Sequence, residues 1–169
     1  MELKQKQQKT IRIIITGGTF DKQYDELRGE LTLRKTHLPE ILKQVRCTIP
    51  ITLEINQLKD SLEMVEEDRR KIIDACVSSE EDWIIITHGT DTMDVTARTL
   101  LSTFRGKEKT IVLTGAMIPY SVSGSDAIFN LGCSISAVQL LPHGVYVCMN
   151  GKLFPAETVR KNVHLGIFE

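Results

Sequence analysis

The chain has 169 residues, of which 25% are charged and 41% hydrophobic, and its formal net charge is −1. This length supports one domain with a buried core and is too short for two ordinary domains. The balanced charge favours neither nucleic acid nor an acidic membrane surface as a partner, and the longest apolar runs are too short to span a bilayer. Residues 1–10 form a polar tail that resembles neither a signal nor a transit peptide, so we expect a cytoplasmic protein with one domain over residues 11–169.

The cysteines and histidines do not follow a metal-binding pattern. No CxxC pair occurs, and the cysteines lie in or beside apolar segments, so we expect free thiols and no disulfide framework. The histidines show no i, i+4 pairing and no neighbouring carboxylate at ligand spacing, so we expect no metal. The residues concerned are Cys47, Cys76, Cys133, Cys148, His37, His88, His143 and His164.

The first third of the chain predicts a strand, a polar excursion and a short helix. Ile11–Ile15 is a predicted strand that ends at the turn Thr16-Gly17-Gly18-Thr19. The polar segment Lys22–Arg34 predicts a mobile loop or short hairpin, which beside a site often acts as a lid. A short helix from Leu38 to about Val45 follows, because Pro39 suits a first helical turn.

The middle of the chain holds the most apolar strand. Alternation over residues 51–55 predicts a strand, which a turn over 58–64 joins to a helix over Glu66–Ser78. Trp83–Ile86 predicts a buried strand that runs into the turn His88-Gly89-Thr90-Asp91-Thr92. A helix from about Asp91 to Phe104 follows, and either Asp91 or Thr92 can cap it.

The last third repeats the alternation of strand and helix. We predict strands over Thr110–Leu113 and Val145–Met149, with a helix from about Asp126 to Leu140 between them and a Ser/Gly loop capping that helix. A short β-excursion includes Leu153 and Phe154. Such alternation implies right-handed crossovers, so the fold class is α/β: a single doubly wound, mainly parallel sheet of the Rossmann or flavodoxin-like type.

Two Thr-Gly turns follow two strands of this predicted sheet and suggest one shared site, because open α/β sheets bind ligands at the carboxyl ends of their strands. Neither GxGxxG nor GxxxxGK[ST] occurs, so Gly17-Gly18 gives no nucleotide-binding fingerprint. Thr19 is a poor nucleophile alone, but Thr90, Asp91 and a lysine within reach could relay its proton. Taken alone, Gly17-Gly18 is more commonly just a tight turn, and a Thr-Asp pair such as Thr90 and Asp91 more commonly caps a helix. His88 fits a hydrogen-bonded turn residue better than a base.

Several blocks of the sequence resemble one enzyme family. TGGTF (Thr16–Phe20) and THGTDTM (Thr87–Met93) are similar to the two signature motifs of bacterial-type L-asparaginases and glutaminase-asparaginases. LTGAMIP (Leu113–Pro119), SDAIFNL (Ser125–Leu131) and VCMNGKLF (Val147–Phe154) resemble further blocks of this family in the same order. The resemblance runs from about Ile11 to the last residue.

This resemblance implies hydrolysis of a side-chain carboxamide, most simply L-asparagine, to aspartate and ammonia without a metal or organic cofactor. By the family pattern Thr19 attacks the amide carbon, and Thr90, Asp91 and Lys161 form a second group that relays the proton. The sequence leaves open how the two groups divide this work. Ser61 would bind the α-carboxylate of the substrate and Asp91 its α-ammonium, while the turns at Gly18 and Gly89 lie where backbone N–H groups can meet substrate and oxyanion.

The sequence departs from the family pattern in three places. Only eight residues follow Lys161, so we expect the second domain of the family to be absent. Leu62 stands where relatives carry a polar residue beside the matched serine. Tyr24 is the nearest candidate for the family's lid tyrosine and a candidate catalytic residue, because it could shuttle the proton if it folds over Thr19. An exposed loop tyrosine explains it equally well.

These departures keep other functions open. A module that binds an amino acid or amide without turnover, or a subunit of a larger amidotransferase-like assembly, is the alternative to an amidohydrolase, and a different amide is a third possibility. We also expect a homodimer or higher homo-oligomer, because an open sheet edge or exposed apolar surface needs a cover.

Overall fold

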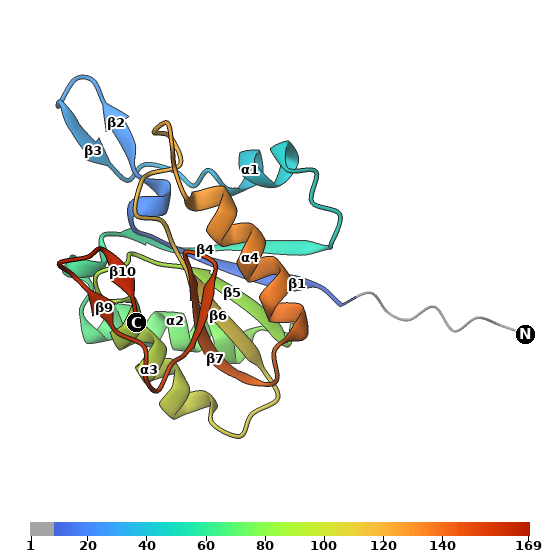
Figure 1. The fold of residues 1–169 in the computed structure, drawn as a ribbon. Coiled ribbons are helices and arrows are strands. Elements are labelled where there is room, and N and C mark those ends of the chain that lie inside the picture. The colour runs from blue at the N-terminus through green and yellow to red at the C-terminus, as the bar shows by residue number, and fades with distance from the viewer. Residues whose placement is uncertain (1–8) are drawn as a thin grey trace, which may run out of the picture.

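The computed structural model describes residues 9–169, so residues 1–8 of the predicted tail lie outside it. Its main sheet has six strands in the order β4-β1-β5-β6-β7-β8 (Figure 1). The first five are parallel, and β8 runs antiparallel to β7. The strands are β1 (Ile11–Gly17), β4 (Ile51–Lys59), β5 (Trp83–Thr87), β6 (Thr110–Thr114), β7 (Gly144–Met149) and β8 (Lys152–Pro155). Counted along the chain, the parallel strands follow the flavodoxin-like order 2-1-3-4-5, which confirms the predicted fold class.

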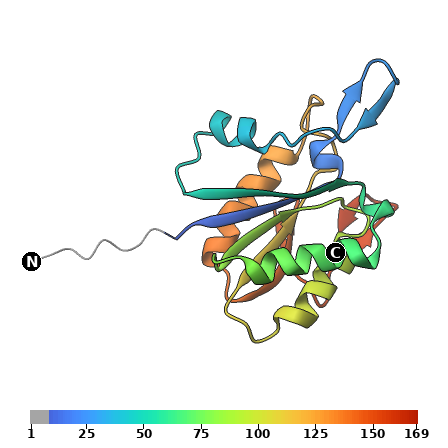
Figure 2. The ribbon, with the colours of Figure 1, turned by 180° about the vertical axis from the view of Figure 1, so that it is seen from behind.

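Helices cover both faces of the sheet, as Figures 1 and 2 show. Helices α2 (Glu66–Ser78) and α3 (Met93–Phe104) share one apolar core with the strands, and α1 (Leu38–Gln44) and α4 (Ala127–Leu140) share the other. Side chains of a strand alternate between these cores: Ile14 belongs to the first, whereas Ile13 and Ile15 belong to the second. The sheet is therefore buried on both sides, which explains the nearly continuous apolar runs in its central strands.

The chain reverses its direction of winding between β1 and β5. From β1 it proceeds to β4 on one side, and from β4 it crosses over to β5 on the other side. In the paired register Ile15 lies opposite Thr87, and Thr87 lies opposite Thr114, so the carboxyl ends of β1, β5 and β6 are aligned. Ligands of open α/β sheets bind at such a switch point, and the turns after β1 and β5 carry Thr19 and Thr90.

Two small hairpins lie at this end of the sheet (Figure 1). Strands β2 (Gln23–Asp25) and β3 (Glu30–Thr32) form the first, which confirms the short hairpin predicted over Lys22–Arg34. The second consists of β9 (Lys161–Asn162) and β10 (Ile167–Phe168). Its first residue is Lys161, so the end of the chain returns to the edge that holds both threonine turns.

Two local predictions were wrong. Strand β4 continues to Lys59, through residues predicted as a turn, because its backbone stays beside β1 as far as Gly17. Neither proposed cap of α3 acts as one: Thr92 occupies the cap position, but its hydroxyl donates to the Ser61 carbonyl oxygen at 2.9 Å. The Asp91 carboxylate is bound by Lys161. In both cases the side chain that could have capped the helix binds a residue distant in the sequence instead.

Candidate active site

Three backbone turns meet in direct contact at the switch point. A Cβ atom added to Gly18, whose φ is +74°, would lie 2.4 Å from both the Cα and the N of Gly89. A Cβ atom added to Gly89 would lie 2.5 Å from the hydroxyl oxygen of Ser61. Only glycine permits this approach, which brings the turns after β1, β4 and β5 together. Thr19 and Thr90 directly follow the two glycines.

Lys161 joins this centre from the end of the chain. Its Nζ donates to Thr90 Oγ1 at 2.8 Å and to Asp91 Oδ1 at 2.6 Å. The Lys161 side chain is 9% exposed and that of Asp91 is 41% exposed. An ammonium group held between a hydroxyl and a carboxylate is within proton-transfer distance of that hydroxyl. Thr90, Asp91 and Lys161 are therefore in contact; the residues alone suggested a relay with a lysine, and the family resemblance identified that lysine as Lys161.

Ser61 carries a buried hydroxyl without a partner. Among residues 9–169, no hydrogen bond to its Oγ is formed, although the residue is only 1% exposed. Its carbonyl oxygen is held by Thr92, and the preceding Asp60 accepts a hydrogen bond from the Leu62 backbone N–H at 3.0 Å. Buried polar groups are nearly always paired, so an orphaned hydroxyl beside Gly89 marks a place where a ligand oxygen can bind.

Leu62 and Tyr24, the other two residues singled out from the sequence, are both largely exposed. Leu62 points largely to solvent, with 72% of its surface exposed. Tyr24 lies in β2, where it pairs with Leu31, and is 63% exposed. This exposure fits an ordinary hairpin tyrosine, and a catalytic role for Tyr24 stays a prediction.

His88 is a structural residue of the turn after β5. It is fully buried, with Nδ1 2.8 Å from the Gly89 carbonyl oxygen and Nε2 2.9 Å from Thr96 Oγ1. These partners fit a neutral ring that donates from Nδ1 and accepts at Nε2. Burial lowers the pKa of His88 to about 4. The prediction that His88 is a hydrogen-bonded turn residue is confirmed.

The buried His88 predicts an acid-sensitive fold. Because its pKa is about 4 in the folded chain and about 6.5 when unfolded, only the unfolded state binds this proton between those values. We expect the free energy of unfolding to fall by about 3 kcal/mol as the pH drops from 7 to 4. Urea titrations at several pH values measure this slope, and His88→Gln should lose most of it. If the free energy of unfolding of His88→Gln depends on pH as strongly as that of wild type, other groups cause the effect.

Sequence reasoning missed Lys22 and Thr92 as residues that join the turns. Lys22 Nζ lies 2.5 Å from Asp60 Oδ2, and Thr92 bonds to the main chain of Ser61. Both contacts link residues more than 30 positions apart. No local sequence pattern predicts such pairs. The position of Lys22, three residues after Thr19, is the one signal that could have identified it.

Comparison with known proteins agrees with this architecture. Residues 10–165 match the family model described as "Asparaginase, N-terminal". The chain is 32% identical to L-asparaginase 1 of Escherichia coli over 163 residues, which cover 92% of this chain and 48% of that protein. It is also 32% identical to a glutamyl-tRNA(Gln) amidotransferase subunit of Archaeoglobus fulgidus, covering 83% of this chain and 34% of the relative.

Solved structures show the same relationship. L-asparaginase I of Vibrio cholerae superposes with a TM-score of 0.82 at 27% identity, over 96% of this chain and 51% of that one. The thermostable L-asparaginase of Thermococcus kodakarensis gives a TM-score of 0.79 at 28% identity, over 95% and 50%. The chain thus spans about half the length of the asparaginases it matches. By sequence and by fold, it belongs to the asparaginase family and corresponds to the N-terminal domain of its members.

Proposed function

We propose that the chain hydrolyses a small carboxamide, with L-asparagine as the first candidate, to the carboxylic acid and ammonia. The observation that carries this proposal is the buried Lys161 ammonium bound to both Thr90 and Asp91, next to the contact between Gly18 and Gly89. The similarity to L-asparaginase 1 of Escherichia coli supports the same reaction.

In the proposed reaction the Thr19 hydroxyl oxygen attacks the amide carbon, and its proton passes through Thr90 and Lys161 to the Asp91 carboxylate. The relay returns this proton to the amide nitrogen, the C–N bond breaks and ammonia leaves. Water then attacks the resulting ester, restores the Thr19 hydroxyl and releases the acid. The Gly18 N–H donates to the Lys59 carbonyl oxygen, so it is the other backbone N–H groups of the turns after β1 and β5 that are suited to stabilise the negative charge on the carbonyl oxygen.

The site where the three turns meet also offers groups for an amino-acid substrate. The Ser61 hydroxyl, which has no hydrogen-bond partner among residues 9–169, is suited to the α-carboxylate, and the exposed part of the Asp91 carboxylate is suited to the α-ammonium. Leu62 adds no polar group, so the amide preferred by this chain need not be asparagine. Tyr24 becomes part of the reaction only if the β2–β3 hairpin folds over Thr19.

Ammonia release from L-asparagine tests this function. The wild-type chain should release ammonia above the rate of Thr19→Ala, which lacks the nucleophile but keeps the backbone of the turn. L-glutamine and simple carboxamides assayed in parallel identify another preferred substrate. If wild-type activity toward every amide equals that of Thr19→Ala, the chain is not an amidohydrolase.

A second candidate function is amino-acid binding without turnover, as a sensor or as one subunit of a larger assembly. The exposed Leu62 favours it, as does the similarity to an amidotransferase subunit in Archaeoglobus fulgidus. Calorimetry distinguishes the candidates: saturable binding of L-aspartate without ammonia release from any amide supports the binding module. Absence of both binding and turnover would contradict both.

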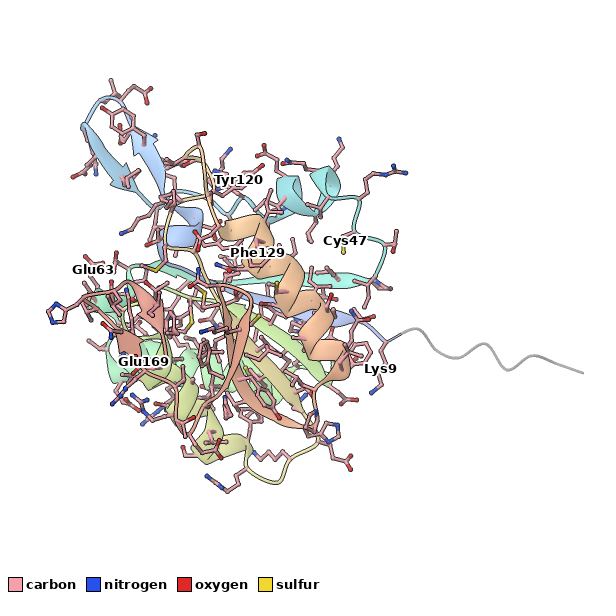
Figure 3. All side chains as sticks on the ribbon, viewed as in Figure 1. Lys9, Cys47, Glu63, Tyr120, Phe129 and Glu169 are labelled. Carbon is pink, nitrogen blue, oxygen red and sulfur yellow. The ribbon has the colours of Figure 1, made fainter. Side chains whose placement is uncertain are left out.

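We further propose that two copies of the chain associate through α4 and the neighbouring edge of the sheet. Helix α4 contains no charged residue, and its outer face exposes Phe129 (58%) and Leu140 (84%), as Figure 3 illustrates for Phe129. A hollow of about 550 Å³ lies along this face and is lined by residues of α4, β7, β8 and the turn between the two strands. Strand β8 ends the order of the sheet.

The exposed face of α4 suits a second copy of itself. Small residues (Gly132, Cys133 and Ser136) lie between Phe129 and Leu140 at helical spacings of three and four. In an antiparallel pair about a two-fold axis, Phe129 of each copy would meet Leu140 of the other, while the small residues let the backbones approach.

Light scattering at micromolar concentration should therefore give about twice the 19.0 kDa mass of one chain. Phe129→Glu should shift this mass to that of a monomer, because it places a charge in the apolar contact. Leu27→Glu, which changes a leucine that is 89% exposed at the tip of the β2–β3 hairpin, is the matched control. A monomeric wild type, or a Phe129→Glu variant that stays dimeric, would rule out this interface.

We propose the cytoplasm as the place where the chain acts. Its four free cysteines support this, and one similar solved structure is described as a probable cytoplasmic L-asparaginase of Campylobacter jejuni. Within residues 9–169, every helix falls short of the length and apolarity needed to cross a membrane.

A further inference from the structure

Lys22 and Asp60 form an ion pair between the turn that carries Thr19 and the turn that carries Ser61. Lys22 Nζ lies 2.5 Å from Asp60 Oδ2, and the two side chains are 24% and 27% exposed. We infer that this pair is a latch that positions the nucleophile turn against the substrate-binding turn, so that Lys22 and Asp60 are positioning residues of the reaction. This inference rests on the proposed amidohydrolase function.

Besides its side-chain contact with Asp60, Lys22 joins three segments through its backbone. Its backbone N–H donates to the Thr19 carbonyl oxygen at 3.2 Å and thereby closes the short helical turn over Thr19–Asp21. Its carbonyl oxygen accepts a hydrogen bond from Ser121 Oγ at 2.8 Å, and β2 begins at the next residue. Lys22 therefore connects the β2–β3 hairpin directly to the Thr19 turn.

Asp60 is the matching junction on the other side. One carboxylate oxygen binds Lys22, while the other accepts the Leu62 backbone N–H at 3.0 Å and caps the short helical turn Ser61–Glu63. Burial raises the pKa of Asp60, but the hydrogen bonds from Lys22 and Leu62 together with the Lys22 charge outweigh burial and leave this pKa below its usual value. The carboxylate is therefore charged at neutral pH, as the latch requires.

The Lys22–Asp60 pair serves to orient the two turns and adds little to the free energy of unfolding. Partly exposed ion pairs contribute little to the free energy of unfolding, because water screens them. The backbone already joins the two turns near this point through the Gly18 N–H and the Lys59 carbonyl oxygen, at 3.0 Å. What the side-chain pair adds is a fixed orientation of the chain after Thr19, and misplacing a nucleophile by a fraction of an ångström slows attack strongly.

A double-mutant cycle tests the latch. Lys22→Met and Asp60→Asn each break the pair, and the asparagine side chain keeps an oxygen that can accept the Leu62 N–H. We expect kcat for amide hydrolysis to fall roughly tenfold in each single variant and no further in the double variant. KM should change by less than about threefold, because the groups that bind the substrate remain. Lys22→Arg should recover most of kcat.

Lys59→Met is the matched control. Lys59 precedes Asp60 and forms a pair with Asp68 at 2.6 Å, but that pair joins the end of β4 to α2 and not to the Thr19 turn. We expect Lys59→Met to lower the melting temperature and to leave kcat within about twofold of wild type.

Hydrogen exchange in the absence of substrate separates the latch from the proposed function. Amides of residues 22–34 should exchange faster in Lys22→Met and Asp60→Asn than in wild type, and at the wild-type rate in Lys59→Met. A wild-type chain that releases no ammonia would refute the amidohydrolase function, while faster exchange would still establish the mechanical link. Unchanged exchange, or single-variant losses in kcat that add in the double variant, would overturn the latch.

Discussion

Replacing Lys161 with methionine should lower ammonia release from L-asparagine by roughly 10²- to 10⁴-fold, the range expected for the loss of a positioned proton-transfer group. Lys161 Nζ is bound to Thr90 Oγ1 and Asp91 Oδ1, and methionine keeps much of the side-chain volume without the ammonium. The fold should persist, because Asp91 is 41% exposed and can be hydrated when its partner is lost. A steady-state assay and a melting curve on the same preparation measure both quantities.

Arg160→Met is the control for Lys161→Met. Arg160 is the preceding residue, and its side chain is 75% exposed and pairs with Glu169 at the end of the chain. Removing this charge should leave ammonia release within about twofold of wild type, since the pair is at the surface. If Lys161→Met is as active as Arg160→Met, the relay of Thr90, Asp91 and Lys161 takes no part in the reaction.

Gly18→Ala should both destabilise the chain and abolish its activity. The new methyl group would lie 2.4 Å from two backbone atoms of Gly89, and backbone cannot move aside as the end of a side chain can. The positive φ of +74° adds strain for any residue with a Cβ atom. We expect a loss of at least about 3 kcal/mol in the free energy of unfolding, from overpacking and backbone strain together. Urea denaturation measures it.

Gly106→Ala separates the two causes. Gly106 has a similar φ of +77°, but an added Cβ atom would meet no atom of residues 9–169 within 4 Å. Its cost should therefore be confined to backbone strain, about 1–2 kcal/mol, and its ammonia release should equal that of wild type. Equal losses of stability in Gly18→Ala and Gly106→Ala would show that the contact between the turns at Gly18 and Gly89 is not tight in solution.

The sequence predicted the regular elements well because their signals are local. The apolar runs of the central strands and the stripe over Glu66–Ser78 follow directly from burial on both faces of the sheet. The doubly wound, mainly parallel fold class also followed, since alternating strands and helices leave few topologies open. The strand order itself came from the structure, because the sequence left both the Rossmann and the flavodoxin-like type open. The end of β4 was misjudged because the partner that extends it, Gly17 of β1, is more than 40 residues away.

The candidate site was predictable only in part. The Thr-Gly turns could be predicted because each follows an apolar strand. In the structure they meet through contacts among Gly18, Gly89 and Ser61. Lys161 came from the family resemblance alone, because no periodicity links the end of the chain to the turn after β5. The predicted caps of α3 were wrong for a related reason. Local propensity favours a cap at Asp91 or Thr92, but both side chains form hydrogen bonds with residues distant in the sequence instead.

A crystal structure of the chain soaked with L-aspartate tests the proposed site most directly. We predict density for the amino acid between Thr19 and Thr90, with its α-carboxylate on the Ser61 hydroxyl and its α-ammonium on Asp91. Its side-chain carboxylate should face Thr19 and the group of Thr90 and Lys161. Aspartate bound elsewhere on the molecule and not at this site, or bound here with its side chain directed away from both threonines, would contradict the proposed chemistry.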